Sequence, residues 1–251
     1  MEPIIELKNV HKSFGDQHVL RGLNLSIERD RISVIIGKSG GGKSVLLKHI
    51  IGLLKPDRGE VIVDGQNIVP LTERQMTPVR RKFGLLFQEA ALFDSMTVAE
   101  NVAFPLREHT KKNSRQIAEI VDQKLASVGL SGVGYKMPSE LSGGMRKRVG
   151  LARALALDPK IVLFDEPTSG LDPVMSAAIN ELIMRTQSDF NTTGVVISHD
   201  IAATMSIAHT IFMLYEGRII AQGAPEEIKN SDNPVVRQFI RGEAKGPIKI
   251  A

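Results

Sequence analysis

Residues 37–44 read Gly-Lys-Ser-Gly-Gly-Gly-Lys-Ser, and this stretch decides how the rest of the chain is interpreted. It fits the pattern G-x-x-x-x-G-K-[ST], in which glycines let backbone N–H groups come close to phosphate oxygens. The apolar run 32–36 before it predicts a buried strand, and the apolar stretch 45–51 after it predicts a helix that ends near Gly52. Strand, loop and helix together predict a phosphate-binding site at a helix N-terminus.

The chemistry of this loop gives each side chain a role toward a nucleoside triphosphate. Lys43 supplies a positive charge for the β- and γ-phosphates, and Ser44 offers a hydroxyl ligand to Mg²⁺. We expect the other loop positions to bind through their backbone. The nucleotide contacts predicted in this segment are Gly37, Lys38, Ser39, Gly40, Gly41, Gly42, Lys43, Ser44 and Val45.

A second candidate anion site lies in Leu-Ser-Gly-Gly at 141–144. Ser142 is a good helix N-cap, and Gly143 and Gly144 expose backbone N–H groups at the start of the predicted helix. One nucleotide needs only one phosphate loop, so a second site of this kind suggests that it serves the nucleotide of another subunit. The alternative is an ordinary serine cap that binds no ligand.

Two adjacent carboxylates follow an apolar run. Residues 161–164 read Ile-Val-Leu-Phe and predict a buried strand that ends at Asp165 and Glu166. Ligand sites of α/β folds lie at the carboxyl ends of strands. Asp165 fits binding of Mg²⁺, directly or through water, and Glu166 fits the base that orients an attacking water. Taken alone, such a pair is also compatible with a plain strand exit.

These motifs, taken in order along the chain, resemble the ABC (ATP-binding cassette) ATPases. Between Phe14 and His199 the family's stacking aromatic, phosphate loop, glutamine, Leu-Ser-Gly-Gly signature, Asp-Glu pair, D-loop and histidine each occur once. The resemblance implies ATPase activity with ATP and Mg²⁺. It also implies a fold: an α/β protein with a P-loop, RecA-like parallel sheet core, an antiparallel β-subdomain and an α-helical lobe.

The same resemblance implies roles for four further residues. Phe14 would stack on adenine, and Gln88 would bind Mg²⁺ and the attacking water and sense the transport partner. Asp172 belongs to the D-loop at the nucleotide, and His199 would contact the γ-phosphate and act in catalysis. Without the resemblance, Phe14 would be interpreted as a core residue, and a histidine at a strand end is more often structural. With Glu166 and Lys43, the predicted catalytic set is Glu166, His199, Lys43 and Gln88.

Local patterns agree with this domain plan. Asp64-Gly65 is a hairpin signal, and Thr97 with Glu100 forms a capping box that opens a helical region. Asn113 can cap a further helix. The apolar positions of that helix share one face; they are Ile117, Ile120, Val121, Leu125 and Val128. We expect an ATPase domain at 1–240, with a helical lobe at about 89–150, and a tail at 241–251 that contacts a partner.

A finer resemblance is to the branch that serves MCE-type, or Mla-type, phospholipid transport systems. The segments 42–48, 92–102 and 141–155 carry it. Val45 stands where the wider family has Thr, which removes a hydroxyl contact to the α-phosphate. Met145 stands where the wider family has Gln, which removes a polar group near the nucleotide across the dimer. Both features concern nucleotide affinity and leave the γ-phosphate chemistry intact.

The resemblance also implies partners and a location. It implies a head-to-tail homodimer, an integral membrane permease (MlaE-like), a STAS-domain regulatory subunit (MlaB-like) and an MCE-domain protein (MlaD-like). The chain would lie on the cytoplasmic face of the inner membrane, held through the permease. A groove for a permease helix is expected at Gln88, Leu92, Phe93, Met96 and Phe104, unless these residues belong to the core.

The sequence also predicts a contact for the tail. Ile248 and Ile250 are apolar residues in a stretch that otherwise holds glycine, proline and three basic residues. Their apolar character favours docking on the second ATPase chain or on a regulatory subunit. The alternative is a frayed terminus.

Composition excludes several other functions. The net charge of +4 among 251 residues is too small to indicate nucleic-acid binding, and aromatic residues make up only 4% of the chain. The lack of cysteine excludes disulfides and thiolate zinc sites. No run approaches the ~18 apolar residues of a transmembrane helix, and the N-terminal residues do not match a signal peptide.

Two alternatives remain beside a lipid-transport motor. An importer ATPase for amino acids or ions would share the chemistry and differ in its permease. A soluble ABC ATPase acting on nucleic acid or ribosomes usually carries two cassettes or a long coiled coil, and this sequence has one cassette and no sustained heptads.

Overall fold

The computed structural model describes residues 2–249, and the chain forms two compact units. The first unit contains the residues up to Arg80 and those from Val195 onward, and the second contains Arg81–Gly194. The expected α/β class is confirmed: parallel strands, an antiparallel sheet and a group of helices are all present. Each unit is described in turn.

An antiparallel sheet forms one part of the first unit. Its strands are β1 (Pro3–Phe14), β2 (Gln17–Glu28), β4 (Arg58–Val63) and β5 (Gln66–Asn67), in the order β2-β1-β4-β5. The hairpin predicted at Asp64-Gly65 joins β4 to β5, with φ of 50° and 79° at its two central residues, as a tight hairpin turn requires.

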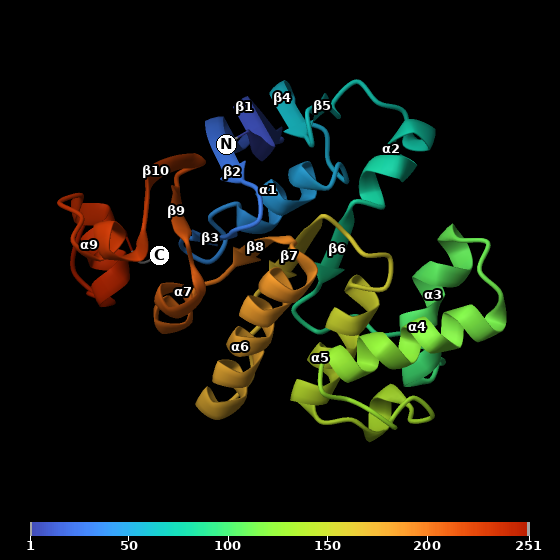
Figure 1. The fold of residues 1–251 in the computed structure, drawn as a ribbon. Coiled ribbons are helices and arrows are strands. Elements are labelled where there is room, and N and C mark those ends of the chain that lie inside the picture. The colour runs from blue at the N-terminus through green and yellow to red at the C-terminus, as the bar shows by residue number, and fades with distance from the viewer. Residues whose placement is uncertain (1, 250–251) are drawn as a thin grey trace. The chain divides into compact units, whose positions relative to one another are not determined.

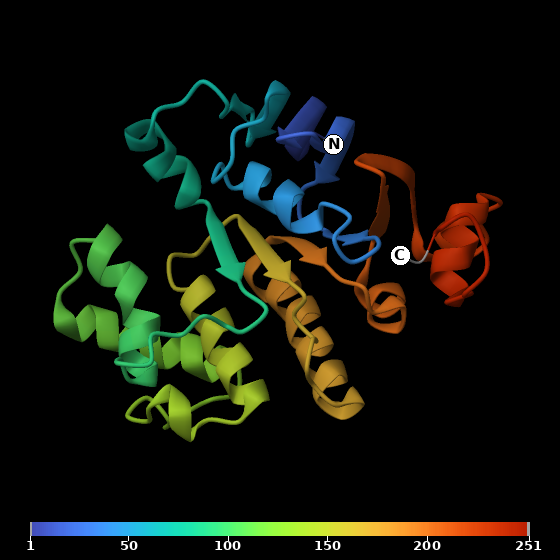
Figure 2. The same cartoon turned by 180° about the vertical axis from the view of Figure 1, so that it is seen from behind.

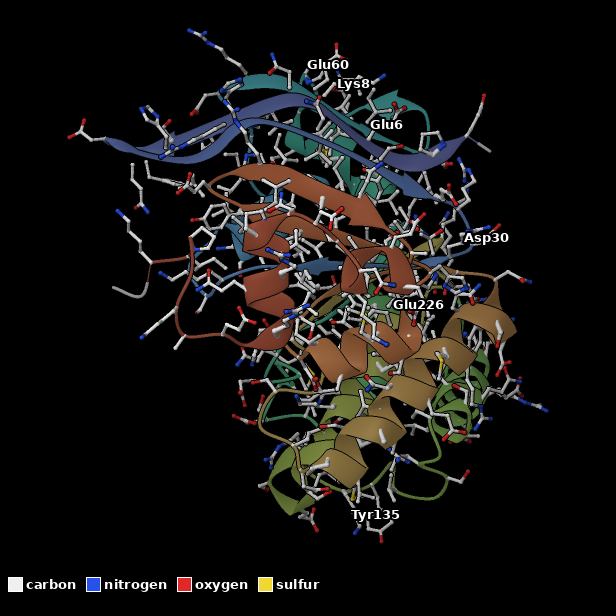
Figure 3. All side chains as sticks on the ribbon, turned by 90° about the vertical axis from the view of Figure 1, so that its left-hand side faces the viewer. Glu6, Lys8, Asp30, Glu60, Tyr135 and Glu226 are labelled. Atoms are coloured by element: carbon white, nitrogen blue, oxygen red, sulfur yellow. The ribbon has the colours of Figure 1, made fainter. Side chains whose placement is uncertain are left out.

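The two faces of this sheet differ in chemistry. Alternate residues of β2 are buried, among them Leu23, Leu25 and Ile27. On the opposite face, the side chains of Glu6, Lys8 and Glu60 point away from the sheet (Figure 3), and the Lys8 ammonium lies 3.2 Å from the Glu6 carboxylate. This alternation is typical of an antiparallel sheet with one solvated face.

Parallel strands form the other part of the first unit. β3 (Ile32–Ile36) is fully buried and pairs in parallel with β9 (Thr210–Tyr215), to which β10 (Arg218–Gly223) pairs antiparallel. The unit's helices are α1 (Lys43–Ile50), α2 (Glu73–Arg80), α7 (Ile201–Ile207), α8 (Pro225–Lys229) and α9 (Pro234–Arg241). The strand and helix predicted around the phosphate loop are thus confirmed as β3 and α1.

The second unit combines two parallel strands with four α-helices. β6 (Phe83–Leu86) pairs with β7 (Ile161–Asp165), and Figure 2 shows the two strands side by side. α3 (Val98–His109), α4 (Ser114–Ser127) and α5 (Gly143–Ala154) lie together in Figure 1, and a short 3-10 helix (Pro138–Glu140) precedes α5. α6 (Pro173–Phe190) follows β7. The caps predicted at Thr97 and Asn113 are both formed.

Strand β8 (Thr193–Ile197) carries the chain from the second unit into the first. At its start the Thr193 N–H donates to the Lys160 carbonyl, 2.9 Å away, and just after its end the Ser198 N–H donates to the Ile35 carbonyl, 3.2 Å away. All five of its residues are buried. Buried strands of this kind need no polar face, which explains the uninterrupted apolar runs in the sequence.

The tail folds back on α9 within the first unit. The amide of Gln238 is buried; its Nε2 donates to the carbonyls of Glu243 and Ile248, and its Oε1 accepts the Ile248 N–H at 2.6 Å. The Lys38 ammonium donates to the Lys249 carbonyl, 2.9 Å away. Ile250, the second apolar residue of the predicted docking segment, lies outside the described residues.

No helix within residues 2–249 is both long enough and apolar enough to cross a bilayer.

Helix α1 contains a fully buried histidine, His49. Its Nδ1 lies 2.7 Å from the Val45 carbonyl, so this nitrogen carries the proton and donates. Burial lowers the pKa of His49 below its ordinary 6.5; the Val45 hydrogen bond raises this pKa in part, and nearby Lys12 lowers it further. The folded chain therefore favours the neutral ring.

We expect this histidine to make folding stability depend on pH. Below its ordinary pKa of 6.5 the unfolded chain binds a proton that the folded chain resists. The free energy of unfolding should therefore fall as pH drops below about 6.5, by at most about 1.4 kcal/mol per pH unit. Urea unfolding at about pH 5.5 and about pH 7.5 measures this slope.

A His49→Leu variant should lose most of this slope. The carboxylates of Asp57, Glu73 and Glu100 also have altered pKa values, but these are lowered from 3.8 or 4.5, so their stabilisation is lost only at more acidic pH. An equal slope in the variant and the natural chain would assign the effect to another group.

Candidate functional site

The phosphate loop joins β3 to α1 within the first unit. Gly37 passes so close to the next strand that a Cβ atom there would lie 2.3 Å from the Leu214 carbonyl oxygen. Gly42, with φ of 97°, turns the backbone into the first residue of α1. Both positions need glycine, the first for close approach and the second for its left-handed conformation. The sequence pattern therefore reflects real backbone constraints.

Lys43 lies at the centre of this loop. Its side chain is 7% exposed, and Nζ donates to the carbonyls of Gly37 at 2.8 Å and Lys38 at 3.2 Å. The first turn of α1 contains no acidic side chain, so the helix N-terminus and the ammonium present positive charge together. This cradle fits a polyphosphate.

The loop fits a magnesium ion only in part. Ser44 is exposed at the start of α1 and can supply one hydroxyl ligand. Among residues 2–249, no three histidine or acidic side chains gather into a protein-only metal cage. Magnesium commonly takes one or two protein ligands and completes its shell with phosphates and water, so the residues present suit magnesium held together with a nucleotide.

Phe14 ends β1 with 47% of its surface exposed. The Lys12 ammonium lies 5.5 Å from the ring centroid. An aromatic ring so exposed is not part of the core, and its free surface suits stacking against a flat ligand. The core interpretation of Phe14 thus lacks support.

A cavity of about 410 Å³ opens beside the phosphate loop. It is lined by the first residues of β2 (17–19), loop residues 38–41, the end of β9 with the turn after it (214–217) and tail residues 247–249. Its volume is in the range of small-molecule sites. The tail's position at this cavity could not be read from the sequence.

His199 lies near the phosphate loop in the first unit. Because the Ser198 N–H bonds to the Ile35 carbonyl, the ends of β8 and β3 lie side by side; Gly37 follows β3 directly, and His199 follows Ser198. His199 is exposed, and the next residue, Asp200, caps α7 by accepting the Ala203 N–H. The structure therefore brings the predicted histidine to the strand edge from which the loop emerges.

The second unit assembles a different part of the predicted site. β6 and β7 pair from Phe83 with Ile161 to Leu86 with Phe164, so their carboxyl ends share one edge. Gln88 lies two residues past β6, and its Nε2 donates to the Ser169 hydroxyl at 3.2 Å. Asp165 is the last residue of β7. The glutamine and the acidic pair thus lie at the same edge.

Glu166 has an uncommon backbone conformation. Its φ is +48°, in the left-handed region that side-chain-bearing residues rarely adopt. The turn that follows is closed by the Ser169 N–H bonding to the Glu166 carbonyl at 3.1 Å. Such conformations cluster at functional sites, where the surrounding structure holds them.

The signature segment begins α5. Ser142 is exposed and caps the helix by accepting the Met145 N–H at 3.3 Å, while Gly144 is buried. Asp172 caps α6 by accepting the N–H groups of Val174 and Met175, each at 3.0 Å. Ser142 and Asp172, two of the predicted nucleotide contacts in this unit, thus have a structural role as caps within a single chain.

An apolar surface accompanies the Gln88 loop. Phe93 is 42% exposed, as is Phe87, which the sequence analysis did not single out. The rings of Phe93 and Phe104 lie 4.9 Å apart, and Leu92 and Met96 are half-buried. The expectation of an accessible apolar patch therefore agrees with the exposure of these residues.

Two residues missed by the sequence analysis hold this surface in place. The buried Asn101 amide accepts the Phe93 N–H and donates to the carbonyls of Phe93, Met96 and Thr97. Arg153 donates to the carbonyls of Ala90 and Ala91, each 2.7 Å away. Only Asn101 could have been found from the sequence, because it is a polar residue on an otherwise apolar helix face.

Comparisons with known proteins agree with this geometry. The family model described as "ABC transporter" matches residues 20–169. The probable ribonucleotide transport ATP-binding protein mkl of Mycobacterium tuberculosis is 47% identical over 244 residues, which is 97% of this chain and 68% of mkl. The intermembrane phospholipid transport system ATP-binding protein MlaF of Haemophilus influenzae is 44% identical over 98% of this chain and 93% of its own.

A solved structure extends the likeness to three dimensions. The ATP-binding cassette MJ0796, a dimer in a post-hydrolysis state bound to ADP and Pi, superposes with a TM-score of 0.80 at 32% identity, covering 88% of this chain and 98% of its own. The family model covers more than half of the chain, and the relatives cover nearly all of it. We conclude that the chain belongs to the ABC transporter family and is an ATP-binding cassette that hydrolyses ATP.

Proposed function

We propose that this chain is the motor subunit of a membrane ABC transporter that moves phospholipids through an MCE-type, Mla-type system. One observation carries the proposal: near-full-length similarity to MlaF, which is named for intermembrane phospholipid transport. Val45 and Met145, features of the same branch, support it. The chain itself would lie at the cytoplasmic face of the inner membrane, held there by its permease.

A second substrate has a specific observation in its favour. The relative mkl, at 47% identity, is named as a probable ribonucleotide transporter component. This chain covers 93% of MlaF but only 68% of mkl. MlaF is thus matched over more of its own length, which favours phospholipid as the substrate. No comparable observation favours an amino-acid or ion importer, or a soluble ATPase acting on nucleic acid or ribosomes.

The chain's own residues would divide ATP binding between them. Phe14 would stack on adenine, and backbone N–H groups of residues 37–45 would hold the phosphates around Lys43. Ser44, Gln88 and Asp165 would hold Mg²⁺, which neutralises charge on the phosphate oxygens when bound. The cradle around Lys43 and the exposed ring of Phe14 are the features that support these roles.

Glu166 would act as the base in hydrolysis. Its carboxylate would take a proton from a water molecule as that water attacks the γ-phosphorus, so that the bond to the β-phosphate oxygen breaks and ADP leaves. Gln88 would orient the water, while Lys43 and His199 would stabilise the charge that develops on the γ-phosphate. The left-handed backbone of Glu166 and the edge it shares with Gln88 support this assignment.

We expect Glu166→Gln to keep ATP binding and to lose turnover. The amide matches the carboxylate in shape but cannot accept the proton, so kcat should fall by a factor on the order of 10² to 10⁴. Lys43→Ala should weaken ATP binding as well, because the loop loses its central charge. Phosphate release and ATP titration measure the two effects. Turnover of Glu166→Gln within about tenfold of the natural chain would remove Glu166 from the role of base.

The active form would be a head-to-tail pair with two ATP molecules. Each nucleotide would lie between the phosphate loop of one chain and Ser142–Gly144 of the other, in a twofold-symmetric interface. The exposed position of Ser142 at the start of α5 supports this arrangement, as does the dimeric state of the related cassette.

Mixed dimers test whether the sites are composite. A chain with Lys43→Ala and a chain with Ser142→Arg are each expected to be inactive alone. In a mixed pair both lesions fall in one site and the other site is intact, so about half of the hydrolysis per dimer should return if the two sites act independently. Tagging the two chains differently allows mixed dimers to be purified and assayed. Mixed dimers that form but remain inactive would argue against shared sites.

The apolar surface around Phe93 would receive a cytosolic helix of the permease. It is formed by Phe87, Leu92, Phe93, Met96 and Phe104. The tail 241–251 would contact a further partner, either the second ATPase chain or a STAS-domain subunit, with an MCE-domain protein elsewhere in the complex. The exposure of Phe93 supports the first of these contacts, because much of this ring remains accessible beside the Gln88 loop even though it packs on Phe104.

Purification from membranes in detergent tests substrate and partners together. We expect the natural chain to recover an integral membrane protein with bound phospholipid, whereas nucleotides without lipid would favour the mkl-like substrate. Phe93→Asp should lose the membrane protein and keep ATP binding, because a charge would be buried at the contact. Tyr135→Asp alters another exposed aromatic of the same unit (Figure 3) and should lose nothing.

The same experiment addresses the tail. Deletion of residues 241–251 should leave ATP binding by the isolated chain unchanged and weaken recovery of the complex. Full recovery of the complex at native expression levels would show that the tail is not needed for a partner contact.

A further inference from the structure

Lys147 is a buried cation on the helix that begins at the signature. It lies between Arg146 and Arg148 in α5, where the sequence resembles a solvated basic face. Yet only 6% of Lys147 is exposed, whereas Arg146 faces solvent. A buried ammonium is unfavourable unless its donors find acceptors, so the contacts of Lys147 identify what it is there to hold.

Those contacts are with the turn that follows Glu166. The Lys147 Nζ donates to the carbonyls of Pro167 at 2.8 Å and Ser169 at 2.6 Å. These two carbonyls belong to one tight turn, so a single ammonium joins α5 to two of its residues. Ser169 is also the residue whose hydroxyl accepts from Gln88.

The turn needs such support because Glu166 is in the left-handed conformation, with φ of +48°. Conformations of this kind persist only when neighbouring groups fix them. Other hydrogen bonds also act on the turn, among them Ser169 N–H to Glu166 carbonyl, Leu171 N–H to Thr168 carbonyl, and Gln88 to Ser169. Lys147 is the group among these that comes from the signature helix.

Electrostatics add to the geometry. Burial lowers the pKa of Lys147, and the carboxylates of Glu89 and Glu166 raise that pKa in part. Both carboxylates therefore lie within electrostatic reach of the Lys147 ammonium. An apolar side chain of similar length would supply neither the two hydrogen bonds nor this charge.

We propose that Lys147 is a positioning residue: it fixes the Glu166 turn and thereby sets the orientation of the Glu166 carboxylate for hydrolysis. The inference rests on the proposed role of Glu166. Lys147 lies five residues after Ser142, about 7.5 Å along the helix. The base in one site and the signature at the start of α5 are thus joined by a rigid helix and one side chain.

A second buried lysine of the same unit provides a matched control. Lys124 is 7% exposed, and its Nζ bonds to Asp158 at 2.5 Å and lies 4.4 Å from the Phe190 ring centroid. It contacts no part of the Glu166 turn. Replacing either lysine removes a buried ammonium, but only Lys147 holds the turn.

The test compares Lys147→Met, Lys147→Gln, Lys147→Arg and Lys124→Met in the full-length dimer. Lys147→Met should lower kcat about tenfold or more, with ATP affinity within about threefold, because only the base is displaced. Lys147→Arg, which keeps donors and charge, should regain part of the lost kcat. Lys124→Met should lower the unfolding temperature as much as Lys147→Met and keep kcat within about twofold.

A double-variant cycle then asks whether Lys147 acts through Glu166. In a Glu166→Gln background, Lys147→Met should cause little further loss in single-turnover hydrolysis, because the group it orients is already gone. If Lys147→Met does not fold, Lys147→Gln replaces it in the same double-variant cycle.

Two results would overturn the inference. One is a kcat of the Lys147 variants within about twofold of the natural chain, and the other is an equal loss in both backgrounds. Both results differ from the one that would remove Glu166 from the role of base, which is turnover retained by the single variant Glu166→Gln.

Discussion

The hydrogen bonds from Lys43 to the carbonyls of Gly37 and Lys38 close the phosphate loop between β3 and α1, and the arrangement of the first unit depends on them. An ammonium within this loop requires the backbone to curve around it. That curvature requires glycine at Gly37, where the chain passes the Leu214 carbonyl, and at Gly42, where it turns into α1. The buried β3 and its neighbour β9 provide the rigid base from which the loop starts. The loop is therefore a preformed cradle for phosphate rather than a flexible segment that must be ordered on binding.

The second unit holds a carboxylate and an amide at one strand edge. Parallel pairing of β6 and β7 brings the loop of Gln88 to the end of β7, and a hydrogen bond to Ser169 joins that loop to the turn after Glu166. Lys147 ties the same turn to α5. Asn101 and Arg153 hold the adjoining loop that carries Phe93. The apolar surface proposed for a permease and the turn proposed for catalysis are thus connected by short, directional contacts within one unit, which is the physical basis for expecting movement at one to be felt at the other.

Most of the fold could be predicted from the sequence because its signals are local. The strand at 32–36, the hairpin at Asp64-Gly65, and the caps at Thr97 and Asn113 each depend on neighbouring residues, and all are present in the structure. The end of β6 at Leu86 could not be read from the sequence, because an apolar run does not show where its last residue stops pairing. The motif order likewise indicated the family, which the comparisons confirm.

The sequence by itself determined the chemistry of the loop and the family, because glycine spacing and strand-end carboxylates are properties of adjacent residues. Only the tertiary structure decided which charged and polar side chains are buried. Lys147 and Arg146 are neighbours in a basic run, yet one is buried against the Glu166 turn and the other faces solvent. Gln238 likewise resembles an ordinary helix residue, and its contact with Ile248, ten positions later, fixes the tail beside the phosphate loop. Such contacts join residues distant in sequence, and their partners are backbone carbonyls and N–H groups that every residue possesses, so no side-chain pattern can identify them in advance.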